Sequence, residues 1–243
     1  MIRMRKFGFD NENGTSFGYG LRFLEFPVIQ YGGEIIKSIQ VYGRKEPLTE
    51  RTGMYIDTVI TNKMEFNCHN PLDYQKKLRS IKQWILSTKK LTYTDMEDSY
   101  FLVKKVEITD EVRLYGIYGV ITVVFTCSPS LYLYEGDYEI VLSSGDHELY
   151  NAYSKSQPLY KIFGNGTCTM TINGKQLKVD VNGSVTLDTE LMIAYTAGVM
   201  KNASVIGEYK NMVLKPGENT IFISPGFTVS VTPKWRILDD SNI

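Results

Sequence analysis

The chain has 243 residues, and its basic (Lys and Arg, 27) and acidic (Asp and Glu, 27) side chains are equal in number, so its formal net charge is zero. A dedicated nucleic-acid-binding protein is not expected, because such proteins carry an excess of basic charge. Hydrophobic residues make up 43% of the chain and charged residues 22%. This composition is typical of a globular protein with one or two domains.

The N-terminus shows no pattern for export. The basic segment Met1–Lys6 is followed by Phe7-Gly8-Phe9-Asp10 instead of an apolar run, so we expect no secretory signal. No stretch is long and apolar enough to span a bilayer. The three cysteines, Cys68, Cys127 and Cys168, are odd in number and far apart. They predict reduced, buried thiols in a protein made in a cytoplasm.

Alternating apolar residues predict strands in the first half of the chain. The alternation covers Phe17–Phe23, Ile35–Val41 and Leu114–Phe125. A period of two places one face of each strand inward, so we expect every second side chain of these segments to be buried.

One segment departs from this alternation and predicts the only long helix, over residues 71–87. Asn70 is a favourable N-cap, and Pro71 suits the first helical position. Trp84 lies about 80° from the apolar stripe, at roughly 100° per residue, and favours a core contact over docking on a neighbour. Lys76 belongs to the opposite, solvent-facing side. The stripe itself consists of Tyr74, Leu78, Ile81 and Ile85.

Two further strands are predicted after the helix, Lys90–Tyr93 and Tyr100–Ile108, separated by an acidic turn at Asp95–Asp98. In the second strand the apolar positions change phase at Lys104-Lys105. A one-residue slip of this kind predicts a β-bulge.

The second half of the chain predicts a β-sandwich, since short strands alternate with frequent turns and no helix pattern appears. Asn173-Gly174 is a two-residue hairpin signal. Turns are also expected at Gly164-Asn165-Gly166, Asn182-Gly183 and Lys215–Glu218.

Ser128-Pro129-Ser130 is expected to end the strand at Phe125 and to mark a domain boundary. The fold predicted is mainly β with one helix, with a first domain over residues 1–130 and a second over 131–243. The polar segment Asp137–Gln157 is hard to assign. We expect the second core to start near Pro158, with the preceding strand swapped in or paired at an edge.

Three short motifs resemble functional sites, but each has a structural explanation that we favour. Cys68-His69 would need two more metal ligands nearby, so a buried thiol beside a helix start is expected. Asp146-His147-Glu148 is interpreted as a solvated loop, because neighbours in a strand point to opposite faces. Gly164-Asn165-Gly166 lacks the Lys-Ser/Thr and the helix of a phosphate loop. We therefore expect no catalytic residue, no metal site and no cofactor.

The order of these elements is similar to that of a known family. An N-terminal β region precedes the helix with Leu78–Ile85, followed by Leu91-Thr92-Tyr93 and an acidic turn. A sandwich then contains Asn173-Gly174 and Lys215–Ile221, and the chain closes with Pro233-Lys234-Trp235-Arg236. Over nearly its whole length the chain resembles the distal tail (Dit) proteins of siphophages, the phage tail component family.

The resemblance implies a structural virion protein at the distal end of a long non-contractile tail, in phages of Gram-positive hosts. A hexameric ring of N-terminal, tail-tube-like belt domains would surround a lumen for DNA and the tape measure protein. The C-terminal galectin-like sandwich would project outward. The implied partners are the major tail tube protein, the tail-associated tip protein, the tape measure protein and receptor-binding or adhesion proteins. DNA would pass without specific binding, and no membrane would be involved.

The residues themselves are compatible with this role, since a neutral chain suits a conduit through which DNA slides. Unpaired strand edges in the first domain could pair between subunits of a ring. The main alternative is a carbohydrate-binding adhesion module, for which Trp235 is the candidate aromatic of the second domain. A tail-associated hydrolase is a more distant alternative.

Overall fold

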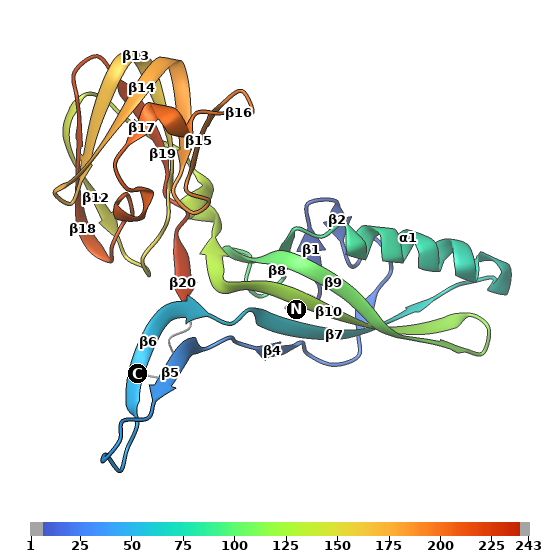
Figure 1. Cartoon of the computed structure of the whole chain (residues 1–243). Helices are drawn as coiled ribbons and strands as arrows, with labels where there is room; N and C mark the ends of the chain where they lie inside the picture. Colours follow the sequence, from blue (N-terminus) through green and yellow to red (C-terminus); the bar gives the residue numbers. More distant parts are fainter. Residues whose placement is uncertain (1–6, 239–243) are drawn as a thin grey trace, which may run out of the picture. The chain divides into compact units, whose positions relative to one another are not determined.

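The structure, a computed structural model, describes residues 7–238 (Figure 1). The basic segment Met1–Lys6 lies outside the described residues. Within them the chain is mainly β with a single α-helix, which confirms the predicted fold class. The chain divides into two compact units: a first unit up to Leu131, to which Leu238 also belongs, and a second unit over Tyr132–Ile237.

The first unit consists of one large antiparallel sheet, one helix and a separate hairpin. The sheet order is β2-β1-β8-β9-β10-β7-β3, and β4 also pairs with β7. The 3-10 turn η1 (Pro71–Asp73) leads into α1 (Tyr74–Leu86). The strands are β1 (Phe9–Asn11), β2 (Gly14–Thr15), β3 (Arg22–Phe23), β4 (Val28–Gln30), β5 (Glu34–Ile39), β6 (Leu48–Tyr55), β7 (Thr58–Asn67), β8 (Lys90–Tyr93), β9 (Ser99–Leu114) and β10 (Tyr118–Leu133).

The core of the first unit lies between α1 and the sheet. The predicted stripe of α1 is buried, and it packs against the inward residues of β7 and β10. The Asn70 side chain accepts a hydrogen bond from the backbone N–H of Leu72 at 3.0 Å, so the predicted cap starts the helical segment. The alternation expected at Ile121, Val123 and Phe125 is present on β10, and Cys127 continues it. β7, a strand that was not predicted from the sequence, buries Ile60, Met64 and Phe66 in the same core.

The expected change of phase in β9 is present. Phe101, Val103, Val106 and Ile108 all pack against the first core, although the two pairs are out of phase. A strand that keeps all four inward must slip by one residue at Lys104-Lys105.

Two strand predictions in this unit are wrong. Phe17–Phe23 forms successive turns instead of a strand, because Gly18 and Gly20 bend the chain, and only Arg22–Phe23 is extended. Leu114–Phe125 is interrupted by a turn at residues 115–117.

The predicted strand end at Phe125 is also wrong, since β10 continues to Leu133. Pro129 does not interrupt β10, because the ladder between β10 and β7 ends at Cys127. The missing N–H of the proline therefore costs no hydrogen bond of that ladder.

The second unit is an antiparallel sandwich in which one long hairpin serves both layers. Its helical turns are η2 (Tyr134–Asp137), η3 (Asn202–Ser204) and η4 (Tyr209–Asn211). Its strands are β11 (Ile140–Leu142), β12 (Gly145–Asn151), β13 (Leu159–Ile172), β14 (Lys175–Asp188), β15 (Ile193–Thr196), β16 (Val199–Met200), β17 (Val205–Ile206), β18 (Gly217–Ile223) and β19 (Thr228–Thr232). The last strand, β20 (Arg236–Leu238), pairs with β10 and ends at Leu238, which belongs to the first unit.

The hairpin of β13 and β14 turns at Asn173-Gly174, as predicted, with positive φ angles of 48° and 76°. The first half of β13 pairs with β19 and its second half with β18. β14 changes partner in the same way: its first half pairs with β17 and its second half with β15. The two halves of the hairpin therefore belong to different parts of the sandwich.

The glycines predicted as turns lie at this change of partner. Gly164-Asn165-Gly166 is part of β13, and Asn182-Gly183 faces it from β14, so neither is a turn between strands. The Asn165 side chain accepts a hydrogen bond from the Gly183 N–H at 3.0 Å. Glycine allows the positive φ of 78° at Gly183 without strain.

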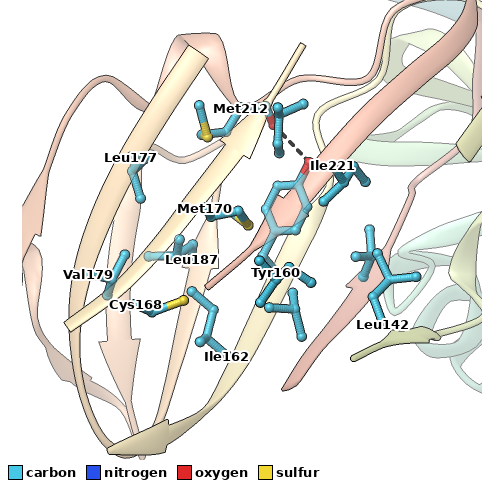
Figure 2. Close-up of a cluster of buried hydrophobic side chains, with 14 of the residues drawn as sticks. Leu142, Tyr160, Ile162, Cys168, Met170, Leu177, Val179, Leu187, Met212 and Ile221 are labelled. Atoms are coloured by element: carbon cyan, nitrogen blue, oxygen red, sulfur yellow. Dashed lines mark hydrogen bonds between the residues drawn. The ribbon is translucent and has the colours of Figure 1, made fainter. Parts of the chain in front are cut away.

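Figure 2 shows the core enclosed by this hairpin, in which the Tyr160 hydroxyl donates to the Met212 carbonyl oxygen at 3.2 Å. The core begins earlier than the predicted Pro158, because Leu133 and Leu142 belong to it. The polar segment Asp137–Gln157 contains two strands. Both are paired at edges, β11 with β19 and β12 with β18, which is one of the two arrangements expected.

The buried stripe of α1 makes a prediction about stability. Leu78→Ala or Ile81→Ala should lower the free energy of unfolding by about 2–5 kcal/mol, because each leaves a cavity under the helix. Lys76→Ala, on the exposed face, should change it by less than about 1 kcal/mol. Chemical denaturation of the three variants measures these differences, and equal losses in all three would contradict the assignment of the face.

Candidate functional site

A hairpin of the first unit stands apart from the core. Among residues 7–238, β5 and β6 pair only with each other, in a two-stranded sheet of their own. Ile35–Val41, predicted as a strand with one buried face, is extended over β5, but its apolar side chains are exposed within this chain. We call residues 34–56 the arm.

The arm exposes an unusual number of large apolar side chains: Ile35, Ile36, Ile39, Val41, Tyr42, Leu48, Met54 and Ile56. An isolated two-stranded hairpin is marginally stable in water, and an apolar one invites pairing or burial. The arm therefore has the character of a contact surface rather than of a solvated loop.

The base of the arm is a close backbone crossing. A Cβ atom on Gly32 would lie 1.7 Å from the carbonyl oxygen of Ile56, so only glycine fits at this position. The Ile56 N–H donates to the Gly33 carbonyl oxygen at 3.1 Å. Next to this crossing, Asp57 forms an ion pair with Lys104 of β9. These contacts hold the start and the end of the arm where it joins the rest of the first unit.

A second apolar surface lies at the other end of the β7–β10 ladder. The arm adjoins the end of the ladder formed by Thr58 and Cys127. The turn between β9 and β10 adjoins the opposite end, formed by Asn67 and Tyr118. We call the exposed apolar residues near this end the tip patch: Leu72 of η1, Val112 and Leu114 at the end of β9, and Tyr115 and Ile117 of the turn.

The tip patch is held in place by Arg113. Its guanidinium donates to the carbonyl oxygens of Pro71 (3.1 Å) and Gly116 (2.7 Å) and lies 4.2 Å from the centroid of the Tyr74 ring. These contacts join the turn to the start of the helix. Leu72 and Tyr115 are 88% and 95% exposed, so the patch is rigidly supported yet uncovered by the chain itself.

The sequence did not single out either surface. An alternating strand looks the same whether its apolar face meets the core of its own chain or another molecule. The available signal was Gly32-Gly33, which marks the arm as a segment set off from the sheet that follows.

The motifs weighed from the sequence do not assemble into a catalytic or metal site. Cys68 is buried in the first core beside the helix start, as expected, and His69 is exposed. Within residues 7–238, no group of three or more His, Cys, Asp and Glu side chains could hold a metal ion. In the same part of the chain, no helix is long and apolar enough to cross a membrane.

Asp146-His147-Glu148 lies in β12, so its assignment to a loop is wrong. Its pairing with β18 places the two carboxylates on the exposed face of the strand and the imidazole on the other. The His147 Nε2 atom lies 2.7 Å from the Ser143 carbonyl oxygen. The three side chains therefore cannot converge on one substrate atom.

Both tryptophans are buried. The Trp84 ring is stacked between Phe9 (4.9 Å between centroids) and Tyr19 (4.6 Å), which confirms the core contact. Trp235 is 8% exposed and belongs to the second core. It therefore cannot offer the open aromatic face that a sugar ring would need.

The three cysteines are free and buried. Burial raises the pKa of the Cys127 thiol to about 12, mainly because the interior disfavours a thiolate. Burial also raises the pKa of Cys168, partly offset by a contact with the Ser224 hydroxyl. Neither thiol has the properties of a nucleophile.

The thiols give a chemical prediction. Alkylation under non-reducing denaturing conditions, followed by mass spectrometry, should label all three cysteines. In the native protein at pH 8, Cys127 should react on the order of 100-fold more slowly than an exposed thiol, since it is buried and protonated. A disulfide in freshly prepared protein, or rapid native labelling of Cys127, would contradict this description.

Comparison with known proteins gives a likeness of fold. No protein-family model matches the chain, and no curated protein matches it. Among solved structures it is similar to the SPP1 Dit protein, described as a paradigm of the hub of the adsorption apparatus in phages infecting Gram-positive bacteria. The TM-score is 0.63 at 12% identity, over 93% of this chain and 98% of that one.

The chain is also similar to a chain of the phage P2 baseplate in its activated conformation with Ca. Here the TM-score is 0.51 at 10% identity, over 98% of this chain and 99% of that one. Over nearly its whole length the chain thus has the fold of a phage distal tail (Dit) hub protein.

Proposed function

We propose that this protein is a structural subunit of the distal end of a long non-contractile phage tail. Copies of the chain would form a ring that connects the tail tube to the tip and leaves a passage for DNA and the tape measure protein. The similarity to the SPP1 hub over nearly the whole of both chains supports this assignment. Six subunits and a galectin-like fold of the second unit are implied by the resemblance to Dit proteins.

The arm is the observation that carries the proposal. Among the described residues its apolar side chains are exposed and belong to neither core, and they are more numerous within one hairpin than the single exposed positions, such as Val141 and Ile206, of the second unit. Burying the arm on a neighbouring copy would stabilise the contact by roughly 25 cal/mol for each Å² of apolar surface removed from water. We therefore assign the contacts between subunits to the first unit.

The positions of the arm and the tip patch favour a ring over a symmetric dimer. A contact between two different surfaces of one subunit repeats head to tail, and it closes when the rotation per subunit divides a full turn. The arm and the tip patch lie at opposite ends of one sheet ladder, as a head-to-tail contact requires. A two-fold dimer would instead pair one surface with itself.

The charge balance supports a passage for DNA. A lumen with a strong basic field would bind the phosphate backbone and stop its movement. Basic and acidic side chains are equal in number in this chain, and on the sheet of the first unit Lys104 and Lys105 pair with Asp57 and Glu107.

The partners proposed are the major tail tube protein, the tail-associated tip protein, the tape measure protein and receptor-binding or adhesion proteins. The proposed location is therefore the tail tip of the virion, after synthesis in the host cytoplasm. A carbohydrate-binding module is the weaker assignment, because its candidate aromatic, Trp235, is buried.

The arm can be tested in the full chain. The triple variant Ile36→Ser, Ile39→Ser and Met54→Ser should lower the oligomer mass measured by light scattering to that of smaller species. Its melting temperature as a monomer should change little, since these side chains lie outside both cores.

A matched control places the same number of serines on the second unit, at the exposed positions Val141, Tyr150 and Ile206. This control should keep the oligomer mass of the natural sequence. Loss of the oligomer in the control, or an intact oligomer in the arm variant, would reverse the assignment of the contacts.

The absence of an assembled site in the described residues predicts no cell-wall hydrolysis. Purified protein should leave no cleared zone on a zymogram that contains host peptidoglycan. Reproducible clearing that disappears with a single Asp or Glu substitution would establish an enzyme and contradict the structural role.

A further inference from the structure

The chain enters and leaves the second unit through two strands that pair with each other. β10 brings the chain in at Tyr132, and β20 takes it out at Ile237. The Leu133 N–H donates to the Trp235 carbonyl oxygen at 3.0 Å, and the Lys234 N–H donates to the Gly136 carbonyl oxygen at 2.8 Å. We call residues 132–136 and 234–237 the stem.

One carboxylate contacts both strands of the stem. Glu190 lies in the loop between β14 and β15. Its Oε1 atom accepts a hydrogen bond from the Tyr132 hydroxyl at 3.3 Å and lies 3.7 Å from Nη1 of Arg236. Its Oε2 atom lies 3.7 Å from Nζ of Lys234. Glu190 thus touches the entering strand once and the leaving strand twice.

The loop that carries Glu190 is itself anchored in the sandwich. The Asp188 Oδ1 atom accepts hydrogen bonds from the N–H groups of Glu190 and Leu191, both at 3.0 Å. The Thr189 hydroxyl donates to the Pro158 carbonyl oxygen at 2.7 Å. A contact with Glu190 is therefore a contact with the body of the second unit.

The cluster is balanced and partly buried. Lys234 also lies 3.6 Å from Asp188, so two cations face two carboxylates. The side chains are 8% (Asp188), 14% (Arg236), 25% (Lys234) and 33% (Glu190) exposed. A network of this kind is screened less than an isolated surface pair and contributes more. Without the charge of Glu190, Lys234 would keep its ion pair with Asp188, whereas Arg236 would lose the carboxylate that it contacts.

The backbone of the stem depends on being held. A Cβ atom on Gly136 would lie 2.1 Å from the Trp235 nitrogen, so the strands approach closely at this point. Lys234 has a φ of +51°, a strained conformation that non-glycine residues adopt only when surrounding contacts impose it. The ion pairs of its side chain are such contacts.

We propose that Glu190 is a positioning residue that clamps both strands of the stem to the β14–β15 loop, and so sets the rigidity of the connection to the second unit. Every covalent path into and out of that unit runs through the stem. This role extends the proposed function and does not require it, because the clamp lies within a single unit of one chain.

Hydrogen exchange of the full chain tests the clamp. In Glu190→Gln, peptides covering residues 130–138 and 232–238 should exchange about tenfold faster than in the natural sequence, because the stem opens locally. Peptides covering residues 160–172, in the core of the sandwich, should be unchanged. Glu208→Gln is the matched control, since Glu208 forms one exposed ion pair with Lys210 and should leave the stem unaffected.

Two further measurements separate a clamp from a general loss of stability. Glu190→Asp, which keeps the charge, should restore part of the protection of the stem, and added salt should loosen the stem of the natural sequence but not that of Glu190→Gln. Unchanged exchange of the stem in Glu190→Gln would overturn the proposal. Equally faster exchange across the stem and the core would also overturn it.

Discussion

The first unit depends on the burial of one face of the ladder between β7 and β10. Ten consecutive residue pairs join these strands, and the inward side chains of both lie under α1. The one polar residue on that face of β7 between Ile60 and Met64 is Asn62, which accepts a hydrogen bond from the buried Tyr93 hydroxyl at 2.9 Å. Because this face must stay buried, the strands cannot shift by one residue without exposing it. The register of the ladder therefore sets the positions of the arm and the tip patch at its two ends.

Both units enclose a core and expose apolar side chains. The second unit surrounds its core with the bent β13–β14 hairpin, and its exposed apolar side chains include Leu191, Met192, Val199 and Met200 around β15 and β16. The first unit buries a compact core but leaves the arm and the tip patch uncovered. Exposed apolar surfaces of this kind favour aggregation of a monomer, so we infer that a defined partner covers them. In the proposed ring, a second copy of the chain would be that partner.

The sequence predicts features that local burial or local turn chemistry determines: the stripe of α1, the alternation at Ile121–Phe125 and the turn at Asn173-Gly174. The sequence does not predict whether a glycine makes a turn or lies in a bent strand. Gly18 and Gly20 make turns, whereas Gly164 and Gly166 lie in a bent strand. It also cannot distinguish burial by the same chain from burial by a neighbour, which is the question at Ile35–Val41. The contact between Tyr132 and Glu190 joins distant segments and has no signal in the sequence pattern.

The state of assembly of the full chain tests the central claim most directly. Native mass spectrometry combined with negative-stain electron microscopy would give both the number of subunits and their arrangement. The account predicts closed rings with a central opening, and six subunits if the resemblance to Dit proteins extends to stoichiometry. A protein that remains monomeric at concentrations well above micromolar, or that forms only two-fold dimers through the second unit, would contradict it.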